Sequence, residues 1–398
     1  MRIMRSPLHV VQISFFSDPQ QRPPEQLMDA WPTLVDVAEA ASRSAIRVSV
    51  VQACAHSKQL VRNGVRYCFL PFGDAPSSRE NVSGFCELLH GLAPDVLHVH
   101  GLAFPRHVLS VAAQAPDVPI ILQDHADRPP RIWRRALWRR GIAKAAAIIF
   151  CTAEHARPFA TAGLLSPTIH LYAIPESTSR FSLGDQGTAR RITQIEGDPA
   201  LLWVGHLNEN KDPLTVLEGI SEAAGTLPGL QLWCCFGTAP LMRRVEQRIA
   251  EDPMLRGRVH LLGRVPHERV ELLMRAADIF VLGSHHESTG FSLIEAMACG
   301  LPPVVTDIPS FRSLTGAGTV GMLWPCNDAS ALSEAIRSVA YRLDSELRAA
   351  VRAHFERQLS FDSLGLKLAA MYQEVVDRSR GALSGERHSE ESASMLAS

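Results

Sequence analysis

The chain has 398 residues, of which 46% are hydrophobic and 20% are charged, and its formal net charge is −1 at pH 7. One hydrophobic core rarely exceeds about 250–300 residues, so this length indicates two domains. A net charge near zero excludes a general electrostatic attraction to nucleic acid or to a membrane, so any anionic ligand has to be bound by a local site. We therefore expect a two-domain globular protein without a nucleic-acid partner.

Cysteine usage and the N-terminal residues bear on the compartment. The eight cysteines are scattered, with no CxxC pair and no Cys/His zinc spacing. Such cysteines are typical of buried, reduced thiols, so we expect a cytoplasmic protein without a structural metal. His9, Gln12 and Ser14 interrupt the apolar start of the chain, which favours a first buried strand over a signal peptide. No apolar run is long enough to span a bilayer.

The first half of the chain alternates apolar runs with amphipathic segments of helical length, a pattern typical of parallel α/β sheets. Strands are predicted over His9–Phe16, Ile46–Gln52, Val96–His100, Ile120–Gln123 and Ala147–Cys151. Helices are predicted around 26–43, 80–91, 105–115, 131–145 and 153–163. We place the first domain at residues 1–175. The loop after its first strand, residues 17–24, contains no glycine, and we interpret its Arg22 as a solvated side chain.

Two segments, residues 94–101 and 123–127, end predicted strands with polar residues. Open α/β sheets bind ligands at the carboxyl ends of their strands, which makes His125 a candidate functional residue. Asp124 and Asp127 do not have Asp-x-Asp spacing, so we expect no metal site there.

Residues 131–140, with sequence RIWRRALWRR, combine arginines with two tryptophans. We interpret the segment as an amphipathic surface helix packed by its tryptophan face. The alternative is a helix that lies on an anionic membrane surface. A peripheral contact with the inner membrane face is therefore a secondary hypothesis.

The second half begins after a stretch rich in Ser, Thr, Gly and Arg, and we place an interdomain linker at 176–199. A strand ends at Gly205, and a helix begins at Pro213, a residue favoured in the first turn. His206 and Lys211 lie in the intervening loop.

The remaining elements complete a second domain over 200–360. Further strands are predicted over 231–236, 259–262, 278–283 and 303–306, and helices over 329–343 and 347–354. A C-terminal helix over 361–378 is expected to return to the first domain, and the tail at 379–398 is expected to be disordered.

Residues 285–311 form a predicted loop–helix–turn–strand unit with Glu287 in the loop and Glu295 in the helix. The amides around Gly290, Phe291, Ser292 and Leu293 can hold a phosphate, because free N–H groups and the helix dipole favour an anion at a helix N-terminus. Glu295 can accept hydrogen bonds from two neighbouring ribose hydroxyls. The alternative is an ordinary loop with two solvated glutamates.

The string from Glu287 through Glu295 to Ala-Met-Ala-Cys-Gly-Leu-Pro resembles the signature of the retaining glycosyltransferases of family 4, which have the GT-B fold. The resemblance implies an α/β protein with two Rossmann-like parallel-sheet domains that face a cleft. It also implies a nucleotide-diphosphate sugar as co-substrate, no further cofactor and no metal dependence. Saccharide and lipid-linked acceptors are common in the family.

The resemblance also implies roles for individual residues. Glu287 is expected near the donor sugar, Glu295 at the ribose and Lys211 at the diphosphate. His125 matches a family histidine that contacts the donor sugar or phosphate. The segment after the strand at 259–262, with Arg264 and Val265, matches the part of the backbone that recognises the base.

The chain departs from the family pattern at several places. Ser288-Thr289-Gly290 replaces the usual Gly-Phe-Gly, and the first loop lacks the usual Gly-Gly pair. His206 replaces an arginine that neutralises the diphosphate, and histidine offers no bidentate fork. The usual Pro-Asn-Gly-Val-Asp turn reads Ile-Pro-Glu-Ser-Thr here, at 174–178.

We conclude that the sequence favours a retaining glycosyltransferase. Two alternatives remain: a nucleotide-sugar epimerase of the same architecture, and a non-catalytic relative that binds sugar nucleotides. A dehydrogenase is disfavoured because no strand is followed by GxGxxG.

Overall fold

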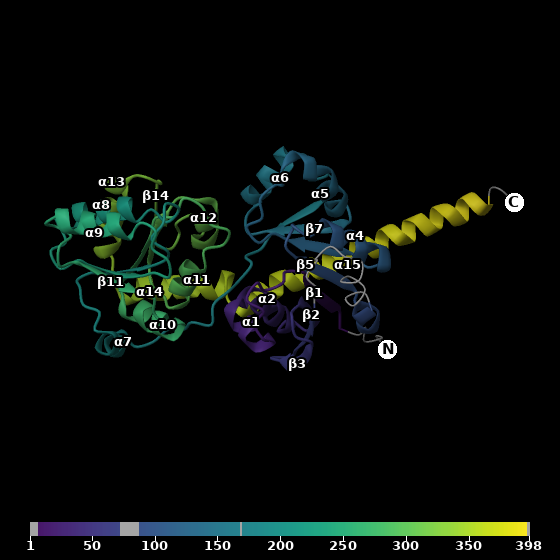
Figure 1. Cartoon of the computed structure of the whole chain (residues 1–398), viewed down its shortest axis with the longest axis horizontal. Helices are drawn as coiled ribbons and strands as arrows, with labels where there is room; N and C mark the ends of the chain where they lie inside the picture. Colours follow the sequence, from purple (N-terminus) through teal and green to yellow (C-terminus); the bar gives the residue numbers. More distant parts are fainter. Residues whose placement is uncertain (1–6, 72–86, 168, 396–398) are drawn as a thin grey trace. The chain divides into compact units, whose positions relative to one another are not determined.

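The computed structural model describes residues 7–71, 87–167 and 169–395, with side chains up to residue 381. The chain divides into two compact units, of which unit 1 comprises residues 1–177 and 361–398 and unit 2 comprises residues 178–360 (Figure 1). Part of the helix predicted at 80–91 lies outside the described residues. No helix among the described residues has the length and apolar character needed to cross a membrane.

The described strands of unit 1 form one sheet in the order β3-β4-β2-β1-β5-β6-β7-β8, parallel except for the β3–β4 pair. Their bounds are β1 (His9–Ser14), β2 (Arg47–Ala53), β3 (Lys58–Arg62), β4 (Val65–Leu70), β5 (Val96–His100), β6 (Ile120–Gln123), β7 (Ala145–Phe150) and β8 (His170–Ala173). All six residues of β1 are buried, as expected for a central parallel strand covered on both faces.

The hairpin of β3 and β4 and the edge strand β8 were not predicted from the sequence. The hairpin turns at Asn63 and Gly64, whose φ angles are 49° and 81°. An Asn-Gly pair between strands is a strong hairpin signal, because both positions of a type I′ turn need positive φ. The hairpin could therefore have been predicted from these two residues.

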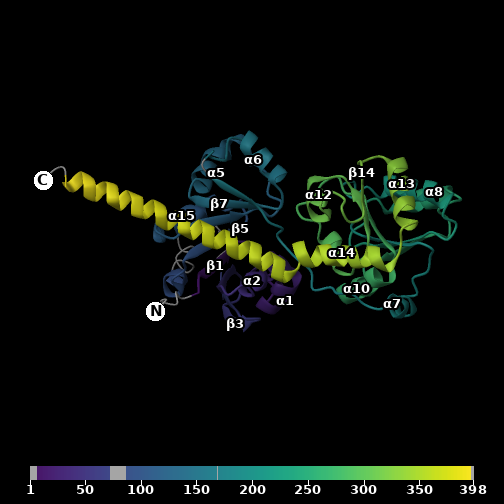
Figure 2. The same cartoon turned by 180° about the vertical axis from the view of Figure 1, so that it is seen from behind.

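Helices cover both faces of the unit 1 sheet. On one face α2 and α15 pack against β1, β5 and β7, and on the other α4, α5 and α6 enclose a second core. Figure 2 shows α15 lying along α2 and the strands. Residues 87–92 are helical, at the end of the helix predicted at 80–91. The helices with both bounds described are α1 (Pro24–Ala30), α2 (Pro32–Ser42), α4 (Pro105–Gln114), η1 (Ile132–Arg134), α5 (Arg135–Ile142), η2 (Ala153–Ala156), α6 (Arg157–Thr161) and α15 (Phe361–Met395). The helix α15 continues past residue 378, through most of the stretch expected to be disordered.

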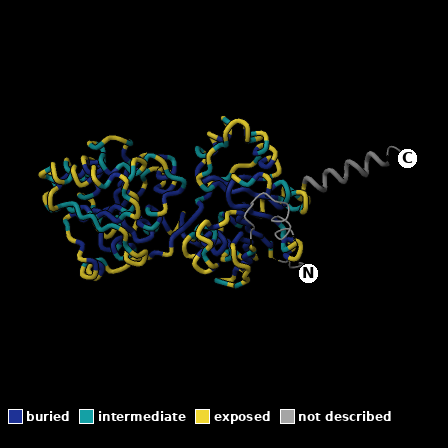
Figure 3. Tube along the Cα trace, in the orientation of Figure 1, coloured by how far each residue is buried: buried dark blue, intermediate teal, exposed yellow. Residues whose placement is uncertain are grey.

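Unit 2 contains a fully parallel sheet in the order β11-β10-β9-β12-β13-β14. The strands are β9 (Ala200–Val204), β10 (Gln231–Cys235), β11 (Val259–Gly263), β12 (Ile279–Leu282), β13 (Pro303–Thr306) and β14 (Met322–Trp324). Figure 3 shows buried backbone running through the middle of each unit, with exposed segments around it.

The helices of unit 2 form two contacting groups, one with α8, α9 and α13 and one with α7, α10, α11 and α14. Their bounds are α7 (Gln186–Thr193), α8 (Pro213–Ala224), α9 (Met242–Glu251), α10 (His267–Ala276), α11 (Phe291–Ala298), α12 (Pro309–Thr315), α13 (Ala329–Ala340) and α14 (Ser345–Gln358). The helix α7 lies inside the stretch interpreted as a linker. Arg190 of α7 pairs with Asp278 at 2.6 Å, which fixes this stretch to unit 2.

Strand order positions the candidate sites. In unit 1 the chain proceeds from β1 to β2 on one side and to β5 on the other, and in unit 2 it proceeds from β9 to β10 on one side and to β12 on the other. A doubly wound sheet opens a crevice at such a switch point, because the loops leave its two central strands in opposite directions. The loops after β1 and β5, and after β9 and β12, are thus expected to bind ligands.

Candidate functional site

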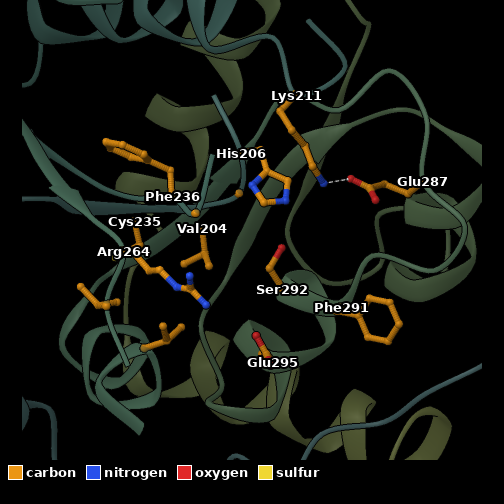
Figure 4. Close-up of a pocket in the computed structure, with 14 residues that line it drawn as sticks. Val204, His206, Lys211, Cys235, Phe236, Arg264, Glu287, Phe291, Ser292 and Glu295 are labelled. Carbon is orange, nitrogen blue, oxygen red and sulfur yellow. Dashed lines mark hydrogen bonds and ion pairs between the residues drawn. The ribbon is translucent and has the colours of Figure 1, made fainter. Parts of the chain in front are cut away.

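A pocket of about 330 Å³ lies at the switch point of unit 2 (Figure 4). It is lined by Val204, Gly205, His206, Lys211, Cys235, Phe236, Gly237, Arg264, Val265, Val270, Glu287, Phe291, Ser292 and Glu295. The sequence predicted ten residues of unit 2 at or near the donor. Eight of them line this pocket, and the other two are Gly290 and Leu293. The structure therefore brings together side chains that are up to 89 positions apart in the sequence, from His206 to Glu295.

The loops after β9 and β12 are tied together at the pocket. Lys211 and Glu287 form an ion pair, and each side chain is 15% exposed. Ser284 donates a second hydrogen bond to the same Glu287 oxygen at 2.6 Å. The His285 amide donates to the Asn210 carbonyl at 2.8 Å. These contacts hold the Lys211 ammonium and the Glu287 carboxylate side by side in the loops that follow β9 and β12.

His206 has a defined tautomer in this structure. The backbone N–H of Thr238 donates to its Nδ1 at 3.1 Å, so Nδ1 carries a lone pair and the proton resides on Nε2. The ring extends into the pocket (Figure 4). His206 can thus offer a ligand one N–H donor without a formal charge, unlike the arginine that it replaces.

The N-terminus of α11 contributes backbone donors. Gly290 caps the helix with φ 100°, and a Cβ there would lie 2.7 Å from the Phe311 ring. The amides of Leu293 and Ile294 both donate to the Gly290 carbonyl, and the Leu293 side chain is fully buried. Of the four residues predicted around this phosphate site, Phe291 and Ser292 are the ones that line the pocket.

Glu295 has a partner that the sequence did not reveal. Its Oε1 lies 2.6 Å from Nε2 of His267, the first residue of α10, and its side chain is 18% exposed. This hydrogen bond raises the pKa of His267, although burial acts in the opposite direction. The contact orients the Glu295 carboxylate toward the pocket before any ligand binds.

Arg264 and Val265 follow β11 and form the adjacent wall. The Arg264 guanidinium points toward the space between Ser292 and Glu295 (Figure 4). It is exposed and takes part in no ion pair with the described residues. A second positive charge is therefore available in the pocket besides Lys211.

In unit 1, His125 belongs to a polar chain at the ends of β1, β5 and β6. Its Nδ1 is bonded to the Glu176 carboxylate, and its Nε2 lies 2.9 Å from Nδ1 of His100. His100 Nε2 lies 3.3 Å from Oε1 of the Gln12 side chain. Gln12 in turn donates to Tyr372 of α15 at 3.3 Å.

These contacts assign the protons. Glu176 accepts only, so His125 Nδ1 donates to it, and Gln12 Oε1 accepts only, so His100 Nε2 donates to it. His100 Nδ1 then accepts from His125 Nε2. Each acceptor in this chain of contacts receives a hydrogen bond when His125 is doubly protonated and His100 is neutral.

Electrostatics agrees with this assignment. Burial, reinforced by the nearby His98 and His125, lowers the pKa of His100 well below its usual value. Burial also acts to lower the pKa of His125, but the hydrogen bond and charge of Glu176 outweigh it and raise that pKa. Burial raises the pKa of the adjacent Asp124 to about 7. The hydrogen-bond pattern and the raised pKa both favour the protonated form of His125, whose side chain is 26% exposed.

Sequence reasoning missed Glu176, His100 and His267. Glu176 stands where the usual family turn is absent, so its unusual position was the available signal. His100 ends a predicted strand in the same way that His125 follows one. No local pattern pointed to His267, which lies 28 residues from Glu295. Within the described residues no group of His, Cys, Asp and Glu side chains has the arrangement of a metal site.

Two family models match separate parts of the chain. The model described as Glycosyltransferase Family 4 matches residues 32–171, and the one described as Glycosyl transferases group 1 matches residues 185–353. The chain belongs to glycosyltransferase family 4. The two matches fall on units 1 and 2 respectively, and the pocket lies within the second.

Curated relatives share part of their length with this family 4 chain. A D-inositol 3-phosphate glycosyltransferase of Geodermatophilus obscurus is 31% identical over 65% of this chain and 60% of the relative. A 2-deoxystreptamine N-acetyl-D-glucosaminyltransferase of Streptomyces fradiae is 32% identical over 35% of this chain and 33% of the relative. The GDP-mannose:cellobiosyl-diphosphopolyprenol alpha-mannosyltransferase of Xanthomonas campestris is 24% identical over 64% and 67%. The matched part thus spans one to two thirds of these relatives.

Solved structures confirm the GT-B-like α/β fold. A glycosyltransferase from Rickettsia africae superimposes with a TM-score of 0.72 over 94% of this chain and 99% of that chain, at 13% identity. HepE of Anabaena, solved in complex with UDP, gives a TM-score of 0.66 over 92% and 100%, at 14% identity. At such identities the likeness concerns the fold alone.

Departures from the family pattern have visible structural counterparts. In the glycine-free loop at 17–24, the buried Asp18 accepts hydrogen bonds from the amides of Gln20 and Arg22 at 3.1 and 3.0 Å. The Arg22 guanidinium pairs with the same carboxylate at 3.3 Å. Arg22 is therefore engaged within its own loop rather than solvated, and it stabilises a loop that has no glycine.

Proposed function

We propose that this family 4 member is a retaining glycosyltransferase that moves a sugar from a nucleotide-diphosphate sugar to a saccharide, lipid-linked or small-molecule acceptor. The observation that carries the proposal is the unit 2 pocket, where Lys211, the N-terminus of α11 and the Glu295 carboxylate meet at a switch point. A cation, backbone amides at a helix N-terminus and a carboxylate in one pocket suit the phosphates and the ribose of a nucleoside diphosphate. The UDP complex of HepE and the GDP-mannose donor in the name of the Xanthomonas relative support the donor class.

The donor would be held by groups of complementary chemistry. Glu295, oriented by His267, accepts from the two ribose hydroxyls. The amides of Phe291 and Ser292, the Lys211 ammonium and the His206 Nε2–H donate to the diphosphate, with Arg264 adding positive charge. The base then lies against the β11 loop at Val265.

The chemistry would depend on electrostatic stabilisation of the leaving group. The bond between the anomeric carbon and the diphosphate oxygen breaks, and the acceptor hydroxyl oxygen bonds to the same face of that carbon. The hydroxyl proton passes to the departing phosphate. Donors already oriented toward that phosphate lower the barrier, because they need no reorganisation as its charge develops.

Glu287 and His125 have separate parts in this proposal. Glu287 is paired with Lys211 and Ser284, so it acts near the donor sugar by orienting the lysine and not as a nucleophile. Both nitrogens of His125 are engaged by Glu176 and His100. We therefore assign His125 an electrostatic role at the donor sugar or phosphate, through its positive charge rather than through a free N–H. All described cysteines are free, which is consistent with a cytoplasmic location.

A thermal-shift screen with UDP, GDP, ADP and their common sugar conjugates tests the donor site, because a ligand that binds the folded state raises its melting temperature. We expect one base to give a clear shift that Glu295→Ala abolishes. Incubation of that sugar nucleotide with candidate acceptors should then release nucleoside diphosphate and yield a glycosylated product with retained anomeric configuration.

The alternatives predict other results. An epimerase would convert the sugar nucleotide to a stereoisomer without net transfer to an acceptor. A non-catalytic relative would show the thermal shift without turnover, and the absence of a shift with every nucleotide would contradict the donor site itself.

A further inference from the structure

Residues 128–153 carry six arginines and one lysine but no aspartate or glutamate. The core of this stretch is η1 and α5, residues 131–140, which we call the basic-aromatic segment. It lies in unit 1, where α5 contacts α4 (Figure 1). Such a one-signed stretch stands out in a chain whose formal net charge is −1.

The two tryptophans of this segment have opposite environments. Trp138 is 8% exposed and packs in the unit 1 core together with Ile142. Trp133 is 70% exposed, and the adjacent Ile132 is 73% exposed. The interpretation of a helix packed by its tryptophan face thus applies to Trp138 alone. Packing within the chain explains neither Ile132 nor Trp133.

The arginines around this exposed pair are not neutralised. Arg131 lies over the Trp133 ring at 5.3 Å, and Arg139 donates to the Gly163 carbonyl at 3.0 Å. Within the described residues none of the five arginines at 131–140 forms an ion pair. Exposed arginines elsewhere do, as Arg244 with Glu209 and Arg378 with Glu374 illustrate.

An isoleucine and a tryptophan that protrude side by side within uncompensated arginines match one kind of surface. The indole ring favours the boundary between water and lipid, and a neighbouring aliphatic side chain gains by burial among acyl chains. Arginines close to an anionic bilayer are attracted by its surface potential. A soluble anion would complement the arginines but would leave Ile132 and Trp133 in water.

We propose that the basic-aromatic segment docks unit 1 on an anionic membrane surface, with Ile132 and Trp133 inserted among the lipid headgroups and Arg134 and Arg140 bound to their phosphates. The proposal concerns a peripheral contact and is independent of the sugar-transfer reaction. The segment belongs to unit 1, whereas the pocket is lined by residues of unit 2 that lie on other elements.

Co-sedimentation of the full chain with vesicles tests this surface. The vesicles are phosphatidylcholine alone, or phosphatidylcholine mixed with phosphatidylglycerol. We expect binding to the mixed vesicles that weakens as salt is raised, and little binding to phosphatidylcholine alone. Arg134→Glu with Arg140→Glu should weaken binding by about 25-fold or more, since each lost cation contributes on the order of fivefold.

Two further variants separate insertion from charge attraction. Ile132→Ser with Trp133→Ser leaves the charge unchanged and should also weaken binding to mixed vesicles by at least about tenfold. Arg243→Glu with Arg244→Glu on α9 makes the same charge change in unit 2 and should leave binding within about threefold of wild type. All these side chains are exposed, so the melting temperature is expected to stay close to that of wild type.

Three results would overturn the proposal. The first is no binding of the wild-type chain to mixed vesicles. The second is a loss of vesicle binding in the α9 control equal to the loss caused by Arg134→Glu with Arg140→Glu. The third is undiminished vesicle binding after Ile132 and Trp133 are replaced. The last result would indicate a polyanion-binding surface rather than an inserted one.

Discussion

Lys211 and Glu287 share a site that is 15% exposed on each side, and the diphosphate of a donor would have to bind beside both. Lys211→Met should therefore do more than remove one cation. It leaves the Glu287 carboxylate, still held by Ser284, as an uncompensated negative charge next to the incoming phosphates. Replacing Glu287 by glutamine in the same chain removes that charge. We predict that the double variant binds nucleoside diphosphate more tightly than Lys211→Met alone.

The expected magnitude follows from the charge separations. At an effective dielectric constant of about 20, unit charges interact by about 4 kcal/mol at about 4 Å and about 3 kcal/mol at about 6 Å. Glu287 already neutralises Lys211 in the free protein, so losing the lysine costs about 2 kcal/mol of binding free energy. Repulsion from Glu287 adds about 2–3 kcal/mol. Lys211→Met should thus raise Kd by about a thousandfold, and the double variant by about thirtyfold.

Isothermal titration calorimetry with whichever of UDP, GDP and ADP gives the largest thermal shift measures these affinities. Lys58→Met is the matched control, because it breaks another lysine–glutamate pair, with Glu25 in unit 1, and should leave Kd unchanged. Lys211→Arg retains the charge and should cost far less than Lys211→Met. Melting temperatures without ligand verify that each variant is folded.

Two outcomes would refute this reasoning. If the double variant bound no more tightly than Lys211→Met, Glu287 would not lie next to the diphosphate. If Lys211→Met bound with wild-type affinity, the pocket would not hold the diphosphate through this residue.

Three further predictions concern other parts of the two candidate sites. Glu295→Ala should weaken nucleoside diphosphate binding by about thirtyfold, because it removes charge-assisted hydrogen bonds to the ribose. His267→Ala, measured by the same calorimetry, should weaken binding less, because it removes only the side chain that orients Glu295. Equal losses in both variants would contradict the ribose assignment. Glu176→Gln should lower the pKa of His125, observed by NMR titration of its ring. Glu176 raises the folded-state pKa of His125, so the stability that the pair contributes is fully present below the unfolded pKa of about 6.5 and is lost as pH rises through the raised value. The difference in melting temperature between wild type and Glu176→Gln should therefore shrink across that pH window. A difference that stays constant with pH would argue against a charged His125. Gly290→Ala should lower the free energy of unfolding by about 2 kcal/mol in chemical denaturation, because φ is 100° and the added methyl group meets an aromatic ring; wild-type stability would show that the loop can relax.

Much of the fold could be predicted from the sequence, because local patterns encode it. Buried parallel strands are continuous apolar runs, so β1, β5 and β6 were predicted to within two residues of their observed bounds. The helix α8 begins at Pro213 as its first-turn proline indicated. The string from Glu287 to Glu295 indicated the family because its members lie on one loop and one helix, where sequence spacing fixes spatial spacing.

Tertiary structure decided which side chains meet. Lys211 and Glu287 are 76 residues apart, and they pair because β9 and β12 are neighbours in the sheet. The chain of Glu176, His125, His100 and Gln12 forms because β1, β5 and β6 are adjacent and end at the same edge. Local periodicity can indicate that a strand exists, but strand order depends on how the whole chain packs. The sequence by itself thus determined the family and most of the elements, whereas the packing of the whole chain decided the proton pattern of His125, the partner of Glu295 and the charge balance around Lys211.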